Sequence, residues 1–429
     1  MTASDTSPDH PAYLRDVPFM GVIWVVHQAV KRGFVNGHPD WCNLGQGQPE
    51  VGEMAGAPPR IDTIQLDPAD HAYGPLGGTD EVRTAVAEHY NRLYRQGKST
   101  QYDKDNVAVA MGGRLALSRS LCALAPLNIG YQLPDYTAYE DMLDLHLSRL
   151  TPVPLVATPE NGFAITAAQF EQAVTDAGLS ALILSNPCNP TGKVIKGAEL
   201  QSMLETGRKH DCLLLMDEFY SHFIYEQGAD GEWGPGDGPI SMAALVDDVE
   251  SDPVLIFDGL TKNHRYPGWR VGWIIGPKHQ VQTVERVASA LDGGPSRVTQ
   301  RAALMALEPD YADQETTAVR EVFAEKRNVM MRALTEMGVT FAAEPDSTFY
   351  SWGCLSNLPE PLNDAKTFFW RALDRQVLTV PGEFFDVNPG KRRRGPSPYE
   401  QWMRFSFGPP MDNMVLGLER LAEMVSEAR

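Results

Sequence analysis

The sequence has few of the features that mark secreted or metal-binding proteins. Its 429 residues include five cysteines, which lie far apart and form neither a Cys-x-x-Cys pair nor a group with histidine at metal-site spacing. Scattered thiols are typical of a reducing compartment, so we predict a cytoplasmic protein without a bound metal. The start, MTASDTSPDHPAYLRD, lacks a basic segment followed by an apolar core. We therefore expect no signal peptide and interpret residues 1–18 as a mobile tail.

Long apolar runs and positive charge are also scarce. The longest apolar runs, such as residues 19–26, fall well below the roughly 20 residues needed to span a bilayer. Lys and Arg number 37 against 56 Asp and Glu, which gives a formal net charge of −19. This charge repels phosphate backbones and anionic surfaces, so neither nucleic acid nor membrane is expected as a partner. The basic run at 391–394, which lies between two glycines, is interpreted as a solvated or interface loop.

What the sequence does contain is an alternation of short apolar strands with amphipathic helices. Such alternation predicts an α/β fold with a mostly parallel central sheet covered by helices. A long amphipathic helix after residue 310 indicates a second, smaller α+β domain, and the glycine-rich acidic segment 226–239 is interpreted as a surface loop insertion. Ligands in α/β folds bind beyond the carboxyl ends of the strands. The clearest buried strands are 106–113, 180–187, 212–218 and 253–259.

Lys262 is the most informative single residue, because it follows directly after the apolar strand 253–259. A lone lysine is most often a solvated surface residue, whereas a lysine beside a buried strand must be paired, lowered in pKa or covalently bonded. Arg270 follows eight residues later, at the start of the next apolar segment. An amine able to form a Schiff base, with a guanidinium nearby for a phosphate, is what pyridoxal phosphate chemistry requires.

Several separate motifs occur in the order typical of one enzyme family. From about Asn43 to Ser406 the sequence resembles the class I/II aminotransferases, which are fold-type I pyridoxal phosphate-dependent enzymes. Each motif alone is moderate evidence, and the whole set is hard to obtain by chance. The motifs are NLGQGQP, AYGPLGG, MGG before a helix, SNPCNPTG, DEFY, TKNHRYPGWR and RFSFGPP.

The resemblance implies how the ring of pyridoxal 5'-phosphate would be held. Lys262 would form the Schiff base and act as the general base, and Asp217 would pair with the pyridinium nitrogen. Asn189 and Tyr220 would donate hydrogen bonds to the phenolic oxygen, while Tyr136 would stack on the ring. Asn189 as a turn residue, Asp217 as a helix cap and Tyr136 as a core residue are the alternative interpretations of these side chains.

The resemblance also implies a phosphate site. Backbone NH groups of Gly113 and Arg114, the side chain of Arg270, and Tyr73 from a partner subunit would bind the phosphate. The family often has a serine three residues before the lysine, where this chain has Gly259, and we expect Thr261 or a water to replace that hydroxyl. Arg114 is a second departure, at a position that is more often small or hydroxylated.

The substrate is expected to bind chiefly through Arg404, which matches the family's bidentate clamp on the α-carboxylate. Gly47 matches the backbone position that closes over the same carboxylate, and Asn189 is expected to contact the substrate as well. Arg297 lies in a segment that in relatives crosses the dimer interface, so contact with the partner's site stays open. No residue near the motifs determines the substrate's side chain.

The resulting hypothesis is a homodimeric aminotransferase that moves an amino group between an L-amino acid and a 2-oxo acid. An alternative is another reaction of the same cofactor, such as elimination, replacement, ring closure of the aminocyclopropane carboxylate synthase type, or biosynthetic bond formation. A non-enzymatic protein that retains the fold is the third possibility. The expected division is a tail at 1–18, an N-terminal arm and part of the small domain at 19–60, a large cofactor-binding domain at 61–310, and a C-terminal small domain at 311–429.

Overall fold

The structure is a computed structural model that describes residues 13, 19, 21–229 and 231–429. Apart from Tyr13, the predicted tail at residues 1–18 lies outside the described residues. The first helix, α1 (Gly21–Val30), contains most of the apolar run noted at residues 19–26. None of the helices in the described ranges has the length and apolar character needed to cross a membrane.

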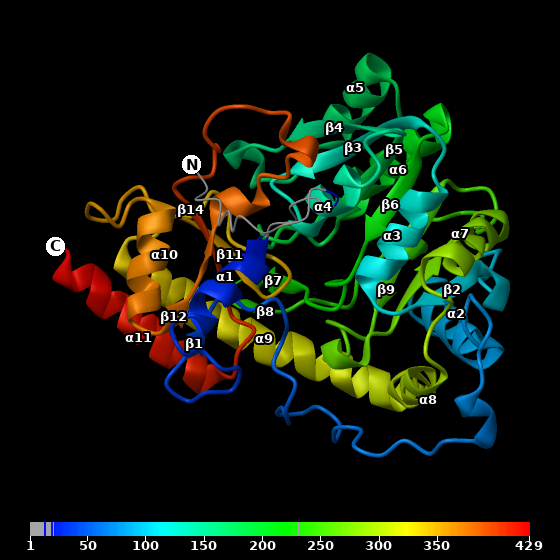
Figure 1. Cartoon of the computed structure of the whole chain (residues 1–429), viewed down its shortest axis with the longest axis horizontal. Coiled ribbons are helices and arrows are strands. Elements are labelled where there is room, and N and C mark those ends of the chain that lie inside the picture. Colours follow the sequence, from blue (N-terminus) through cyan, green and yellow to red (C-terminus); the bar gives the residue numbers. More distant parts are fainter. Residues whose placement is uncertain (1–12, 14–18, 20, 230) are drawn as a thin grey trace.

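A seven-stranded sheet forms the centre of the larger part of the molecule, with the order β2-β10-β9-β6-β5-β3-β4 (Figure 1). Strand β10 is antiparallel to both neighbours, and the other pairs are parallel. The strands predicted from continuous apolar segments are buried along nearly their whole length, which confirms the mostly parallel α/β sheet. The strands are β2 (Val107–Ala110), β3 (Leu127–Leu133), β4 (Leu150–Val156), β5 (Leu179–Ser185), β6 (Leu213–Asp217), β9 (Val254–Gly259) and β10 (Gly272–Ile275).

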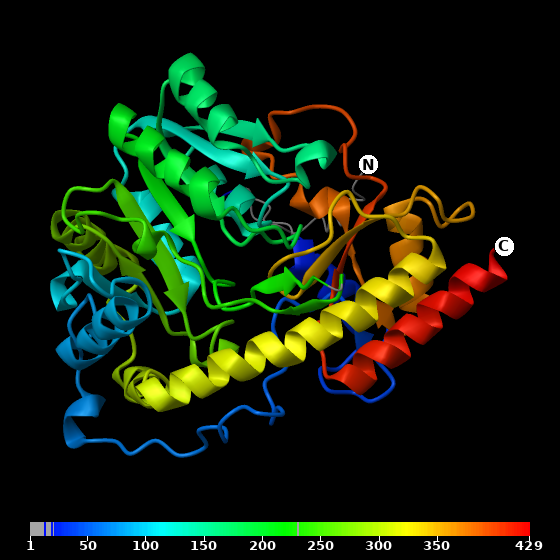
Figure 2. The same ribbon diagram turned by 180° about the vertical axis from the view of Figure 1, so that it is seen from behind.

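Helices cover both faces of this sheet. The helix α3 lies in front of the sheet in Figure 1, whereas α5 and α6 lie in front when the molecule is seen from behind (Figure 2). Because each helix returns the chain to the start of the next strand, the carboxyl ends of the parallel strands meet at one edge. The helices of this part are α2 (Asp80–Tyr94), α3 (Gly113–Ala123), α4 (Ala138–Asp144), α5 (Ala167–Ala177), α6 (Gly197–His210), α7 (Lys278–Leu291) and α8 (Arg297–Ala306).

The remaining elements form a second layer built from both ends of the chain. A three-stranded sheet has the order β11-β14-β13, and the short β1 (Cys42–Asn43) pairs in parallel with β12 (Val377–Leu378). The long helix α9 begins at Pro309, so the predicted domain boundary at 310/311 falls in its first turn. Helices α9 and α11 lie side by side in Figures 1 and 2. The other elements are α9 (Pro309–Met337), β11 (Tyr350–Cys354), α10 (Ala365–Asp374), β13 (Val380–Pro381), β14 (Trp402–Ser406) and α11 (Met411–Glu427).

The segment 226–239, which the sequence predicts to be a surface loop insertion, contains short strands. It takes part in an antiparallel hairpin of β7 (Tyr225–Gln227) and β8 (Trp233–Pro235). The guanidinium of Arg327 on α9 lies 3.9 Å from the centre of the Trp233 ring, and Asn328 donates a hydrogen bond to the Trp233 carbonyl at 2.8 Å. Trp233 therefore anchors the hairpin to the distant helix α9, a contact that the glycine-rich composition did not reveal.

Candidate active site

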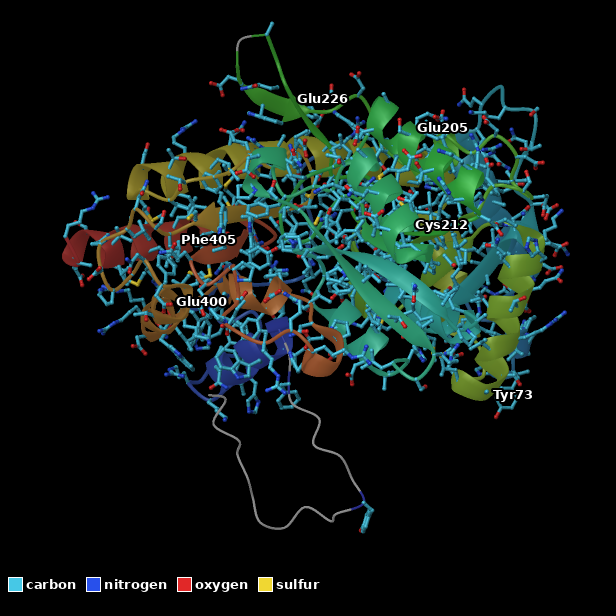
Figure 3. The ribbon with its side chains drawn as sticks, turned by 90° about the horizontal axis from the view of Figure 1, so that it is seen from above. Tyr73, Glu205, Cys212, Glu226, Glu400 and Phe405 are labelled. Carbon is cyan, nitrogen blue, oxygen red and sulfur yellow. The ribbon has the colours of Figure 1, made fainter. Side chains whose placement is uncertain are left out.

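A cavity of about 490 Å³ opens at the carboxyl ends of β5, β6 and β9, between the central sheet and the second layer. Every predicted site residue except Tyr73 lines it, although these residues come from widely separated segments. Tyr73 is fully exposed and lies at the edge of the molecule in Figure 3. The residues brought together are Gly47, Gly113, Arg114, Tyr136, Asn189, Asp217, Tyr220, Thr261, Lys262, Arg270 and Arg404.

Lys262 lies three residues beyond the end of β9, and its amine donates a hydrogen bond to the Gly47 carbonyl. Burial lowers the pKa of Lys262 to about 7, and the positive charges of Arg404, Arg270 and Arg114 act in the same direction. Asp217 opposes this shift. A substantial fraction of the amine is therefore neutral near pH 7, as a nucleophile or a general base requires.

Asp217 is the last residue of β6 and is 5% exposed. Tyr139 Oη donates a hydrogen bond to Asp217 Oδ2 at 2.8 Å. Burial raises the pKa of Asp217 to about 6, and the hydrogen bond from Tyr139 limits that rise. The carboxylate is mostly ionised at neutral pH, so it can stabilise a positively charged ring nitrogen.

One side of the cavity lies at the N-terminus of α3. Gly112 caps this helix with φ +84°, and a Cβ there would lie 2.3 Å from Arg270 Nη2, so only glycine lets the guanidinium lie against the turn. Backbone NH groups in the first helical turn have no partners within the helix, and the helix dipole favours negative charge there. The NH groups of Gly113 and Arg114, together with the Arg270 side chain, can therefore hold a phosphate.

The structure explains why Gly259 replaces the family's serine. A Cβ at Gly259 would lie 2.4 Å from the carbonyl oxygen of Val271, just before the adjacent strand β10, and 2.6 Å from Cα of Gly272, the first residue of that strand. A serine cannot fit there without moving the strand. Thr261 Oγ1 lines the cavity, is buried, and has no hydrogen-bond partner within the described residues. This hydroxyl is available in place of the missing serine.

Arg404, on β14, occupies the opposite side of the cavity and is 1% exposed. Its Nη1 donates to Asn189 Oδ1 at 2.9 Å and its Nη2 donates to the Gly45 carbonyl at 2.8 Å. The Arg404 guanidinium carbon lies 4.1 Å from the centre of the Tyr350 ring. The Tyr350 hydroxyl in turn lies 3.0 Å from the hydroxyl of Tyr220.

Tyr136 and Arg114 form the mouth of the site. Arg114 Nε donates to Tyr136 Oη at 3.0 Å, which places a guanidinium beside the aromatic ring predicted to stack on the cofactor. Within the described part of the chain Arg114 forms no ion pair. Its side chain is consequently available to a ligand, in addition to the backbone role predicted from the sequence.

Some site residues were missed by sequence reasoning. Tyr139 lies three residues after Tyr136, and Tyr350 lies in the alternating segment STFYSWG. Neither pattern distinguishes a site residue from a core aromatic residue, and both side chains are almost completely buried. The cavity is further lined by the apolar residues Val22, Ile23, Val26 and Phe34 from and just after α1.

Tyr73, which is predicted to act across an interface, and Arg297, for which such a role is left open, lie close together on the surface. A Cβ at Gly74, next to Tyr73, would lie 3.1 Å from Arg297 Cγ. Arg297 Nε lies 3.5 Å from Asp70 Oδ1, and Arg301 also pairs with Asp70. Within this chain, neither Tyr73 nor Arg297 is among the residues that line the cavity.

Comparison with known proteins identifies the class of enzyme that this fold and site define. The family profile described as aminotransferase class I and II matches residues 39–421, so the chain belongs to this family. The prediction of an amino-group-transferring enzyme is confirmed, and the alternative reactions are not favoured.

The particular relatives are mostly aspartate aminotransferases. One from Streptomyces avermitilis is 27% identical over 403 residues, covering 89% of this chain and 91% of the relative. An aspartate/prephenate aminotransferase of Cereibacter sphaeroides is 27% identical over 370 residues, covering 82% of this chain and 86% of the relative. The solved structure of Thermus thermophilus aspartate aminotransferase with maleate matches with a TM-score of 0.76 at 23% identity, covering 96% of this chain and 100% of that one. This likeness confirms the fold.

Proposed function

We propose that the protein binds pyridoxal 5'-phosphate in the 490 Å³ cavity and uses it to transfer an amino group between an L-amino acid and a 2-oxo acid. The observation that carries the proposal is that Lys262, Asp217 and Arg404 line one cavity although the sequence separates them widely. A neutral amine, a buried carboxylate and a buried guanidinium are the groups that this cofactor and an amino acid substrate need.

The donor set fits the cofactor on independent grounds. The hydroxyl of Thr261 and Nε of Arg404 are buried without a hydrogen-bond partner in the described ranges, so both are free to meet a ligand. The α3 turn with Arg270 would hold the phosphate, and Asp217 would face the ring nitrogen. Asn189 and Tyr220 would donate to the phenolic oxygen, while Tyr136 would cover the ring.

The residues of the chain then have distinct tasks. Bound pyridoxal phosphate supplies an electron sink for the electron pair that remains when the substrate's α-proton leaves. Arg404 fixes the substrate carboxylate, and its bidentate geometry orients the α-carbon. The amine of Lys262 accepts the α-proton and can donate it to a carbon of the bound cofactor. Asp217, held by Tyr139, keeps the ring nitrogen protonated.

Aspartate is the first substrate that we propose, because the relatives named above are aspartate aminotransferases. An acidic side chain needs a cation besides Arg404, and the guanidinium of Arg114 at the mouth of the cavity provides one. Arg114→Gln should raise KM for aspartate about tenfold and leave KM for a neutral amino acid nearly unchanged. Equal changes for both substrates would exclude Arg114 as the side-chain contact.

We also propose a cytoplasmic homodimer in which Tyr73 completes the partner's phosphate site. Support comes from three exposed apolar side chains, Val51, Leu66 and Tyr73, on the extended segment that leads to α2 (Figure 1). Arg297 lies beside Gly74, the residue after Tyr73. Sedimentation of the native protein should give twice the chain mass, and Tyr73→Phe should weaken cofactor binding. A fully active monomer would contradict the shared site.

Replacing Lys262 with alanine tests the proposed function. The variant should lose the visible absorbance of the cofactor-loaded protein and essentially all conversion of aspartate to its 2-oxo acid. Lys209→Ala is a matched control, since Lys209 is an exposed lysine paired with Glu171 outside the cavity. Retained transamination in Lys262→Ala would refute the assignment.

A further inference from the structure

Asn263 follows Lys262 directly in the chain, yet its side chain points away from the cavity into a buried polar cluster. Its Nδ2 lies 2.9 Å from both carboxylate oxygens of Asp258 and 3.0 Å from Ser221 Oγ, to which it donates. Its Oδ1 accepts a hydrogen bond from the His222 backbone NH at 3.2 Å. Asn263 is 0% exposed, so both ends of this amide are fully used inside the protein.

These contacts connect the two chain segments that carry Lys262 and Tyr220. Ser221 and His222 immediately follow Tyr220, which lines the cavity, and Asn263 immediately follows Lys262. The segment after β6 and the segment after β9 are therefore joined by one amide side chain at the edge of the sheet. A change at this amide would alter the spacing between Lys262 and Tyr220 without removing either side chain.

Asp258 gives the amide a fixed anchor. This carboxylate lies in β9 and accepts hydrogen bonds from the Gly259 backbone NH at 2.6 Å and from Tyr90 Oη at 3.2 Å. Asp258 is 3% exposed, and neither Asp258 nor Asn263 lines the cavity. Burial raises the pKa of the Asp258 carboxyl well above its usual range, but both of its oxygens are hydrogen-bonded, so the anchor does not depend on a negative charge.

We propose that Asn263, anchored by Asp258, is a positioning residue that sets the distance between Lys262 and Tyr220 and holds the Lys262 amine in its enclosed site. The inference depends on the roles of Lys262 and Tyr220 given under the proposed function. Because Asn263 does not line the cavity, it acts through the backbone of its neighbours.

The test is the variant Asn263→Ala, with a measurement that would not change if Asn263 had only a structural role. In the cofactor-free protein, the rate at which formaldehyde and cyanoborohydride methylate Lys262 is measured by peptide mass spectrometry as a function of pH. If the segment loosens, water reaches the Lys262 amine and the charged form of the amine becomes more favourable. The pH at which methylation is half-maximal should therefore rise by about 0.5 to 1 pH unit. In the loaded enzyme kcat should fall about 10- to 100-fold, with KM changing less than about threefold.

Asn106→Ala is the matched control. Asn106 is also 0% exposed and donates to the Gly276 carbonyl and to Glu250, at the far end of β2 from the cavity. It should lower thermal stability and leave the Lys262 midpoint unchanged. If both variants shift the midpoint equally, or if Asn263→Ala does not shift it, the inference is wrong.

A double exchange, Asn263→Asp with Asp258→Asn, keeps the proposal testable if the single variant folds poorly. It restores an amide–carboxylate hydrogen bond with the polarity reversed, and the Ser221 hydroxyl can rotate to donate. The midpoint should return toward that of the unchanged protein, and a double variant no better than Asn263→Asp alone would contradict the inference. Lys262→Ala separates the two hypotheses, because activity there overturns the proposed function itself, whereas an unshifted midpoint in Asn263→Ala overturns only the positioning role.

Discussion

Arg404 and Asn189 are 215 residues apart in the chain, yet Arg404 Nη1 donates a hydrogen bond to Asn189 Oδ1 at 2.9 Å. A second hydrogen bond, from Arg404 Nη2 to the Gly45 carbonyl, and the Tyr350 ring beneath the guanidinium fix the same side chain. The guanidinium proposed to bind the substrate carboxylate is thus oriented by the protein itself. A substrate that binds this guanidinium does not have to order a mobile arginine, which reduces the entropic cost of binding.

Arg404→Lys should weaken substrate binding because an ammonium cannot form the planar pair of hydrogen bonds that a guanidinium forms. We expect KM for the amino acid to rise about 100-fold, which corresponds to about 3 kcal/mol, while the visible spectrum of the loaded enzyme stays the same. Steady-state kinetics and absorbance measure both. Arg420→Lys, at an arginine that binds the Asp40 carbonyl away from the cavity, is the control. An unchanged KM would exclude Arg404 as the clamp.

Tyr139→Phe removes the hydrogen bond that limits the rise in the pKa of Asp217, so this pKa should rise above about 6. More of the carboxyl is then protonated at pH 7 and pairs less well with a ring cation. We expect cofactor affinity to fall about tenfold at pH 7 and to recover as the pH is raised, because Asp217 ionises again. Equilibrium dialysis measures this. Tyr225→Phe, a buried tyrosine bonded to the Thr348 carbonyl, should not show the pH-dependent loss.

The pKa of Lys262, lowered to about 7, should be visible in the cofactor-free protein as methylation that rises with pH and levels off above neutrality. Arg270→Met removes a positive charge and should move the midpoint to higher pH. Asp217→Asn removes the carboxylate that raises this pKa and should move the midpoint to lower pH. Shifts in the same direction for both variants would show that the neighbouring charges do not set the reactivity of Lys262.

Three buried histidines should make the protein sensitive to acid. Burial lowers the pKa of His89 and of His264 to about 3, and that of His222 falls well below its usual range. Their ring centres lie within 6.2 Å of one another. The unfolded chain binds protons below about pH 6.5 where the folded chain does not, so stability is retained above that pH and lost as the pH falls toward 3.

The expected loss between pH 7 and pH 5 is about 2 kcal/mol for each such histidine, measured by urea unfolding. His89→Phe, which keeps a ring of similar shape, should reduce the loss of stability between pH 7 and pH 5 by that amount. His38→Asn, at an exposed histidine, should leave the dependence as it is. An equally steep loss in His89→Phe would show that other groups cause the acid sensitivity.

Much of the fold and most of the site could be predicted from the sequence because their physical signals are local. A strand buried on both faces must be continuously apolar, as 212–218 and 253–259 are. A lysine or an aspartate at the end of such a strand is costly unless it has a partner, which made Lys262 and Asp217 stand out. The order of the motifs then pointed to the family.

The rest depended on which segments become neighbours, and that is a property of the whole packed chain. Gly259 departs from the family pattern because strand β10 beside it leaves no room for a Cβ. A loop separates Gly259 from β10 in the sequence, so the local sequence does not reveal this contact. Tyr139 and Tyr350 look like core aromatic residues until the fold places their hydroxyls on Asp217 and Tyr220. The sequence alone determined the chemistry of the site, through residue types that are expensive to bury; the tertiary structure decided which of them meet, because hydrogen bonds and steric contacts form only between groups that packing brings within a few ångströms.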